Sequence, residues 1–227
     1  WINKTGVFAP QDEPDFESAE VYRLLRWKRG PHGQHIELGI SEMNLFMLLG
    51  MFGIADTLID EPIIPIGTVY DPFVCRGLDA FIYGLYSGAR FIVAGTPSGI
   101  TLSPEGGAHQ SAVTPSLGIE LPNLESFEPC FAQETAWLML EALQLCVDPD
   151  GRAGYLRLST RPIDQTLIQP VVARLGAAEL RRQVLRGGYR LTEPYADPSA
   201  PVVHLAVAGA LVPEALEAAA YLRRDGV

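Results

Sequence analysis

Residues 62–96 read PIIPIGTVYDPFVCRGLDAFIYGLYSGARFIVAGT, and this stretch indicates the fold most clearly. Residues 62–70 are rich in β-branched side chains and predict an extended segment. Asp71 and Pro72 follow as a typical N-cap and first helical residue, so a helix is expected from there to about Ser87. Residues 89–94, apolar apart from Arg90, are typical of a buried strand. The order strand, helix, strand predicts two parallel neighbours joined by a helix.

The same alternation continues on both sides of this stretch. Residues 36–40 predict a strand that leads into a helix capped at Ser41. Further on, the expected elements are a short strand at 124–128, a helix from Pro129 through Cys146 and a strand at 154–159. The sequence therefore predicts an α/β fold, a parallel sheet with helices on both faces. Ligands of such sheets bind at the carboxyl ends of the strands, here in the loops at 39–42, 70–71 and 95–118.

The pattern also suggests a division of the chain. Residues 1–35 form a lead-in segment with one amphipathic stretch at 18–28. We expect the α/β domain at 36–165, a linker with one helix (174–186) at 166–200, and a new strand (202–208) and helix (213–224) within 201–227. A single strand and helix cannot bury their own apolar faces. We therefore expect residues 201–227 to be the truncated start of a second domain.

Composition excludes several classes of protein. The chain has 227 residues, 48% of them hydrophobic, and a net charge of −10, which argues against a nucleic-acid or anionic-membrane surface. The longest apolar run, at 45–55, is shorter than the roughly 20 residues that cross a bilayer. Three cysteines without metal-ligand spacing make a disulfide scaffold or a zinc site a poor interpretation. No metal site is predicted, and a cytoplasmic setting fits best.

The residues by themselves leave the chemistry open. The sequence contains no nucleophile elbow, phosphate loop or dinucleotide fingerprint. Glu42, in the first turn of an apolar helix, can simply complement the helix dipole. Tyr70 and Phe73 can be core aromatics, and His109 can be a loop histidine bonded to the backbone. Arg76 and Arg90 can bind an acidic group of a substrate, although a salt bridge within the protein is the simpler use.

Several short motifs, taken in order, resemble a known family. Gly39-Ile40-Ser41-Glu42 resembles the glycine-x-x-glutamate signature of transketolase-like pyrimidine-binding domains. Further matches follow in the family's order and near its spacing: Pro62 and Pro65, Tyr70 and Phe73, Gly95-Thr96 with Ser98-Gly99, and Glu105-Gly106 with His109. Residues 6–12, 185–191 and 202–227 resemble flanking parts of the homodimeric bacterial pyruvate dehydrogenase E1 component. The resemblance covers nearly the whole chain, and the shared order makes it specific.

The resemblance implies thiamine diphosphate as cofactor and a role for each matched residue. It implies that Glu42 hydrogen-bonds the aminopyrimidine ring and so activates the cofactor. A carboxylate in a dry pocket suits this sharing of a proton. Tyr70 and Phe73 match positions that face the ring, where aromatic packing holds it in plane. His109 matches an active-site histidine near the reacting carbon, although Gln110-Ser111-Ala112-Val113 departs from the family pattern there.

Part of the implied site is absent from the sequence. The family holds Mg²⁺ and the diphosphate with a Gly-Asp-Gly motif, which does not occur here. The resemblance therefore implies that other domains of a parent chain, in a homodimer, complete the site, and that a lipoyl-bearing E2 acyltransferase accepts the acyl group. The expected function is decarboxylation of pyruvate or another 2-oxo acid, and the fragment alone is expected to be inactive. Ketol transfer of the transketolase type and a non-catalytic scaffold are the alternatives.

Overall fold

The computed structural model describes residues 2–11, 28–101, 105–193 and 202–225, and it divides the chain into two compact units, 1–41 and 42–227. In the first unit, α1 (Ile2–Thr5) precedes β1 (Val7–Phe8), which pairs in parallel with β2 (Arg29–Gly30). The amphipathic stretch expected at 18–28 lies almost entirely outside the described residues. The strand expected at 36–40 was wrong, because Gly39 adopts φ +65° and interrupts an extended run.

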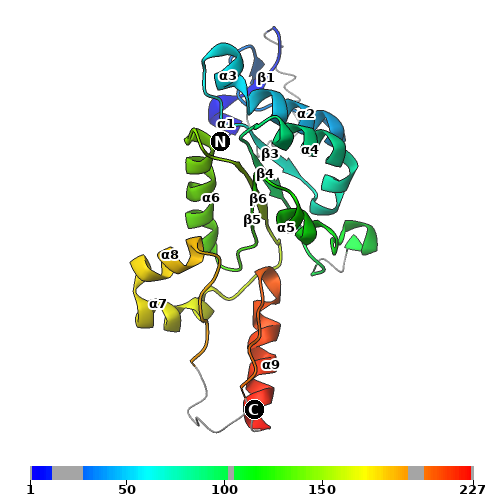
Figure 1. Ribbon diagram of the computed structural model, residues 1–227. Coiled ribbons are helices and arrows are strands. Elements are labelled where there is room, and N and C mark those ends of the chain that lie inside the picture. Colours follow the sequence, from blue (N-terminus) through cyan, green and yellow to red (C-terminus); the bar gives the residue numbers. More distant parts are fainter. Residues whose placement is uncertain (1, 12–27, 102–104, 194–201, 226–227) are drawn as a thin grey trace. The chain divides into compact units, whose positions relative to one another are not determined.

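The second unit is built on four parallel strands. These are β3 (Ile66–Val69), β4 (Ile92–Gly95), β5 (Leu124–Phe127) and β6 (Ala153–Arg157), in the spatial order β3-β4-β6-β5 (Figure 1). Each neighbouring pair is parallel. The predicted α/β class with a parallel sheet is confirmed, and the expected strands at 62–70, 89–94, 124–128 and 154–159 each overlap one of these strands.

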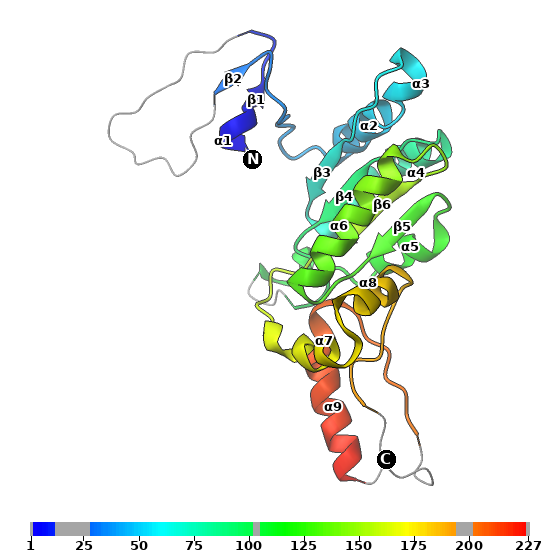
Figure 2. The same ribbon diagram turned by 90° about the vertical axis from the view of Figure 1, so that its left-hand side faces the viewer.

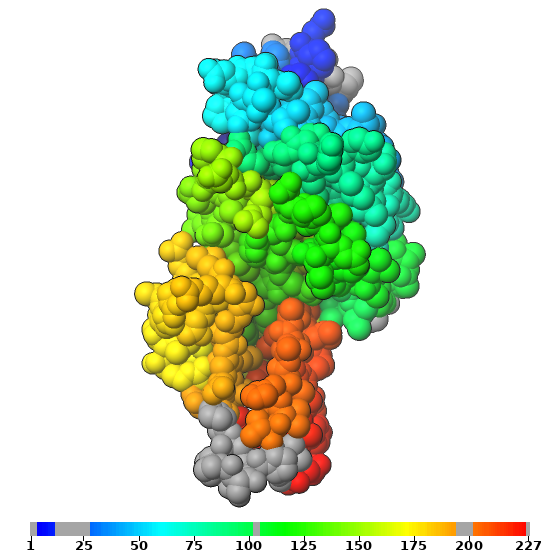
Figure 3. Space-filling view, in the orientation of Figure 1, coloured from blue at the N-terminus to red at the C-terminus, as the bar shows by residue number. Residues whose placement is uncertain are grey.

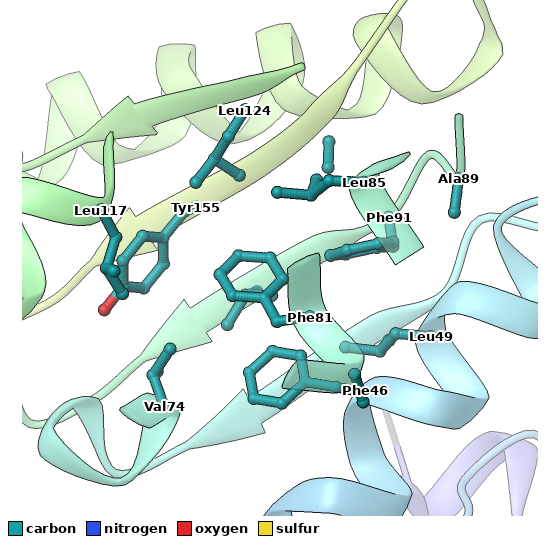
Figure 4. Close-up of a cluster of buried hydrophobic side chains, with 13 residues drawn as sticks. Phe46, Leu49, Val74, Phe81, Leu85, Ala89, Phe91, Leu117, Leu124 and Tyr155 are labelled. Atoms are coloured by element: carbon teal, nitrogen blue, oxygen red, sulfur yellow. The ribbon is translucent and has the colours of Figure 1, made fainter. Parts of the chain in front are cut away.

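Helices cover both faces of this sheet, as predicted. Along β4, Ile92 and Val93 point to opposite faces and join different buried clusters. One cluster contains α2 (Glu42–Phe52) and α4 (Leu78–Tyr86) and is centred on the stacked rings of Phe46 and Phe81 (Figure 4). The other contains α6 (Ala132–Val147), which lies along the opposite face (Figure 2).

The helix expected from Asp71 to Ser87 is two elements. A 3₁₀ segment, η1 (Asp71–Gly77), precedes α4, and the N-cap of η1 is Tyr70. Asp71 therefore does not cap the helix, and its carboxylate turns into the interior. The break falls at Gly77, the N-cap of α4, which has φ −110° and ψ 16°, and a Cβ there would lie 2.7 Å from the Glu42 carbonyl oxygen. This close approach seats η1 against the first turn of α2. A short helix, α3 (Ala55–Ile59), follows α2.

The part of the chain beyond β6 also differs from the expectation. The single helix expected at 174–186 is α7 (Gln169–Leu175) and α8 (Ala177–Leu185), divided at Gly176, where φ is +77°. The 3₁₀ segment η5 (Gln165–Ile168) precedes them, and both helices pack in the cluster that contains α6. The expected domain limits stay predictions.

The last described segment contains η6 (Gly209–Leu211) and α9 (Val212–Arg224), so the helix expected at 213–224 is present. The strand expected at 202–208 was wrong. No described strand pairs with this segment, and the Val202 and Val203 side chains are exposed. No described helix is both long and apolar enough to cross a membrane.

The long loop between β4 and β5 carries short helical segments. They are η3 (Gly107–His109), η4 (Thr114–Ser116) and α5 (Leu117–Glu120). Because β3 and β4 are parallel neighbours, Tyr70 and Thr96 leave the sheet at the same edge. The fold thus places the 70–77 segment beside this loop.

Candidate functional site

Three aromatic rings from two segments meet at the carboxyl edge of the sheet. We call Tyr70, Phe73 and His109 the aromatic cluster. Ring centroids are 5.9 Å apart for Tyr70 and Phe73, 5.4 Å for Tyr70 and His109, and 5.6 Å for Phe73 and His109. The Phe73 backbone N–H donates to the Tyr70 carbonyl at 2.8 Å, which closes the turn at the start of η1. Tyr70 is 42% exposed, so the aromatic cluster is not part of either buried core.

Arg76 links Glu42 to this cluster. Oε1 of Glu42 is 3.4 Å from Nη1 of Arg76, and the Arg76 guanidinium lies 3.8 Å from the centroid of the Phe73 ring. The Glu42 side chain is 13% exposed and that of Arg76 is 54% exposed. The expectation that Arg76 and Arg90 form salt bridges is confirmed, since Arg90 pairs with Asp56. Glu42 lies at the start of a helix that follows a loop, and the strand expected before it is absent.

The His109 ring is oriented by its own loop. Its Nδ1 lies 3.2 Å from the Glu105 carbonyl oxygen. A carbonyl oxygen only accepts, so Nδ1–H is the donor and Nε2 of the neutral ring keeps its lone pair. The backbone bond that the sequence allowed is therefore present, and it leaves Nε2 available for another partner. The roles of Glu42, Tyr70, Phe73 and His109 stay predictions.

A buried polar network beneath the aromatic cluster was not predicted. Asp71 is fully buried, and its carboxylate accepts hydrogen bonds from the hydroxyls of Ser111, Thr114 and Tyr155. The Arg157 guanidinium lies 3.4 Å from Asp71 Oδ2 and also pairs with Glu128. We call these six residues the Asp71 network.

Two physical features follow from the burial of the Asp71 network. Burial, reinforced by the neighbouring Asp71 carboxylate, raises the pKa of Tyr155, which keeps this hydroxyl protonated as a donor. A signal for the network was present in the sequence, because Arg157 is a charged residue within the apolar run of β6 and a buried arginine needs a partner. Asp71 carried no such signal, since Asp before Pro is also typical of a helix start.

A separate groove, which Glu128 of the Asp71 network helps to line, lies away from the aromatic cluster. It has a volume of about 820 Å³ and is lined by residues 187–193, residues 202–209 and one side of α9 (Figure 3). None of Glu42, Tyr70, Phe73 and His109 lines it. Within residues 2–11, 28–101, 105–193 and 202–225, no group of three or more His, Cys, Asp or Glu side chains could hold a metal ion.

Comparison with solved structures defines the class of fold. No protein-family model matches the chain. A transketolase from Pichia stipitis, solved in complex with fructose 6-phosphate, superposes with a TM-score of 0.70 at 19% identity, covering 87% of this chain and 26% of the other. A complex of that transketolase with sedoheptulose 7-phosphate gives a TM-score of 0.68. The fold is therefore that of a segment of a transketolase.

Comparison with curated proteins gives a more specific resemblance. The pyruvate dehydrogenase E1 component of Mycolicibacterium smegmatis is 27% identical over 92% of this chain and 22% of its own length. That of Escherichia coli K12 is 22% identical over 99% of the chain and 24% of its own length. Transketolase 1 of Pasteurella multocida is 26% identical over 89% of the chain and 28% of its own length. The resemblance to pyruvate dehydrogenase E1 is confirmed, and the chain spans about a quarter of the length of these relatives.

Proposed function

We propose that this chain is the pyrimidine-binding part of a thiamine-diphosphate-dependent enzyme of the pyruvate dehydrogenase E1 type. In this proposal the enzyme decarboxylates a 2-oxo acid such as pyruvate and transfers the acyl group to a lipoyl carrier. The observation that carries the proposal is the position of Glu42. The Glu42 side chain is 13% exposed and lies at the start of an apolar helix. Arg76 contacts both the Glu42 carboxylate and the Phe73 ring of the aromatic cluster. The named relatives support the choice of cofactor.

The residues at this end of the site fit an aminopyrimidine ring. When bound, thiamine diphosphate supplies an acidic thiazolium carbon that adds to a substrate carbonyl. Glu42 would hydrogen-bond the pyrimidine ring nitrogen, and Tyr70 and Phe73 would pack beside the ring. His109 presents Nε2 for a proton at the substrate, a role that suits an imidazole near neutral pH.

Arg76 does not prevent Glu42 from taking this role. Half of the Arg76 side chain is exposed, so water screens its charge, and an ion pair screened in this way contributes about 0–1 kcal/mol. The carboxylate of Glu42 can therefore exchange the guanidinium for a ring nitrogen at small cost. The guanidinium keeps its contact with the Phe73 ring, a cation–π interaction worth about 0.5–1 kcal/mol at an exposed site.

The diphosphate end of the cofactor must be held elsewhere. The sequence lacks Gly-Asp-Gly, and the part of the chain that the structure describes has no cluster of metal-binding side chains. Magnesium sites for phosphates normally use carboxylates together with phosphate oxygens. We propose that other domains of the parent protein, in a homodimer, provide them, and that a lipoyl-bearing E2 acyltransferase is the partner.

The test is Glu42→Gln in the full-length parent protein, assayed with thiamine diphosphate, Mg²⁺, pyruvate and a dye acceptor. We expect turnover to fall by about 10²-fold or more, because proton transfer of this kind contributes roughly 10²–10⁴. Glu214→Gln is the matched control, since Glu214 also lies in the first turn of a helix and pairs with an arginine, Arg161, at 2.6 Å. Unchanged turnover in Glu42→Gln, or an equal loss in Glu214→Gln, would refute the role of Glu42.

A second candidate function is ketol transfer between sugar phosphates. It is favoured by the relatives named transketolase, which match at 26% identity. The same protein assayed with a ketose phosphate donor and an aldose phosphate acceptor distinguishes the two reactions. Absence of turnover with both substrate classes would instead support the non-catalytic scaffold.

A further inference from the structure

One carboxylate joins the two segments that make up the aromatic cluster. Asp71 lies in sequence between Tyr70 and Phe73. Its Oδ2 accepts from Ser111 Oγ and from Thr114 Oγ1, and these residues follow His109 by two and five positions. The ring contacts of His109 with Tyr70 and Phe73 therefore form immediately beside this junction.

The junction is buried and well supported. Asp71, Ser111 and Thr114 have exposed fractions of 0%, 5% and 1%. Gly95 of β4 leaves room for the carboxylate because it has no side chain. A Cβ at this position would lie 2.4 Å from Asp71 Oδ1. Hydrogen bonds to a buried charged group are stronger than those in water, so the loop is held firmly at this point.

Ser111 anchors its loop in two further ways. Its backbone N–H donates to the Gly99 carbonyl at 2.9 Å, and its Oγ accepts from the Gly99 N–H at 3.0 Å. These two hydrogen bonds hold together Gly99 and Ser111, the two ends of the 99–111 segment. The His109 ring is held close to these hydrogen bonds by its bond to Glu105.

The Asp71 carboxylate also has partners on the side of the sheet. Tyr155 O–H donates to Oδ1, and Arg157 supplies the compensating charge from β6. The carboxylate thus has a loop side, formed by Ser111 and Thr114, and a sheet side, formed by Tyr155 and Arg157, and Arg157 Nη2 also lies 3.4 Å from Ser111 Oγ.

We propose that Asp71 is a positioning residue, which holds His109 against Tyr70 and Phe73 through the hydroxyls of Ser111 and Thr114. The contribution of this positioning to turnover rests on the proposed function, but the placement of the imidazole does not. Asp71 acts through the loop. None of its hydrogen-bond or ion-pair partners belongs to the aromatic cluster, so it is not a catalytic residue.

The test compares loop-side and sheet-side variants by NMR of the full chain. Thr114→Val and Ser111→Ala each remove one donor to Asp71 from the loop. Tyr155→Phe removes one donor from the sheet and is the matched control. Thr114→Ser restores the hydroxyl in a smaller side chain. The readout is the set of nuclear Overhauser contacts between the His109 ring protons and the rings of Tyr70 and Phe73.

We expect both loop-side variants to lose these contacts, and Tyr155→Phe and Thr114→Ser to keep them. Each variant retains the other donors to Asp71, so the fold persists and dispersed methyl resonances verify it. The proposal is overturned if the ring contacts survive in Thr114→Val and Ser111→Ala. It is equally overturned if Tyr155→Phe loses them to the same extent, because the carboxylate then acts only through general stability.

A kinetic measurement on the cofactor-loaded parent protein separates positioning from function. For Thr114→Val we expect kcat to fall roughly tenfold or more with little change in KM, since small displacements of a reacting group cost 10- to 100-fold. Thr114→Ser should recover most of the loss. If the wild-type protein does not turn over pyruvate, the proposed function fails while the NMR result still decides the positioning. Lost ring contacts with unchanged kcat support positioning and refute a role for His109 in turnover.

Discussion

Two arginine–carboxylate pairs each include one residue of the η1 segment and have the same distance but different surroundings. In each pair the closest nitrogen and oxygen are 3.4 Å apart. Arg157 and Asp71 have side chains that are 2% and 0% exposed, whereas Arg76 and Glu42 are 54% and 13% exposed. Equal distances therefore do not mean equal contributions. The buried pair is part of the scaffold, whereas Glu42 can exchange the exposed Arg76 for another partner.

The contrast has an electrostatic origin. Water screens the charge of Arg76, so separating it from Glu42 costs little. Arg157 and Asp71 have lost their hydration, and each compensates the other at an effective dielectric well below that of water. Removing one member of such a pair leaves a buried charge without its partner, which is more costly than the pair itself is favourable.

The largest effect is expected for Arg157→Met. This change leaves Asp71 buried with hydroxyl donors but without a cation, and the free energy of unfolding should fall by about 3–5 kcal/mol. Urea unfolding followed by circular dichroism measures the loss as a lower midpoint. A loss below about 1 kcal/mol would contradict the view that the two pairs differ.

A double-mutant cycle provides the control for this prediction. Asp71→Asn alone leaves Arg157 with Glu128 as its carboxylate partner, which is 29% exposed and can be hydrated. If the pair is coupled, Arg157→Met combined with Asp71→Asn should be less destabilising than the sum of the two single changes. Additive losses would show that the two side chains stabilise the fold independently.

A much smaller effect is expected for Arg76→Gln. The exposed pair with Glu42 contributes between zero and about 1 kcal/mol, so the urea midpoint should move little. Raising the salt concentration should reduce even this difference, because exposed charges are screened. A loss comparable to that of Arg157→Met would mean that Arg76 is held far more rigidly than its exposure indicates.

The smallest effect is expected for a pair wholly at the surface of α8. Hydrogen bonds from Arg182 and then from Gln183 lower the pKa of Glu179 from its ordinary value of 4.5 to about 2. A lowered pKa means that the contribution of this carboxylate is present above pH 4.5 and is lost as the pH falls towards 2. Carbon-13 NMR of the Glu179 carboxyl should show the low midpoint, and Arg182→Gln should raise it. An unchanged midpoint in Arg182→Gln would exclude the ion pair as its cause.

The sequence was a reliable guide to the four strands β3 to β6 and a poorer one to the helices and to the strands expected at 36–40 and 202–208. The apolar runs at 89–94 and 154–159 predicted β4 and β6, since strands covered on both faces must be apolar throughout. The helix from Asp71 was predicted as one element, because nothing local shows that Gly77 packs against the first turn of α2. The strand expected at 202–208 has suitable residues, but a strand also requires a pairing partner.

The candidate site was predictable in part. The order of motifs singled out Tyr70, Phe73 and His109, and the fold brings their rings together. The Asp71 network was missed because it depends on contacts across 29 to 86 positions of the chain. A local pattern gives Asp71 the role of a helix cap, whereas the tertiary structure uses its carboxylate to receive Ser111 and Thr114.

The spacing of these two hydroxyls has a consequence for the evolution of the site. Ala112 and Val113 lie between Ser111 and Thr114 and are exposed, while both hydroxyls are buried on Asp71. Residues at 112 and 113 can therefore vary in size and charge without loss of the anchors that shape the loop. Substitutions at these two positions would therefore change the exposed surface of the loop and leave its two buried anchors in place.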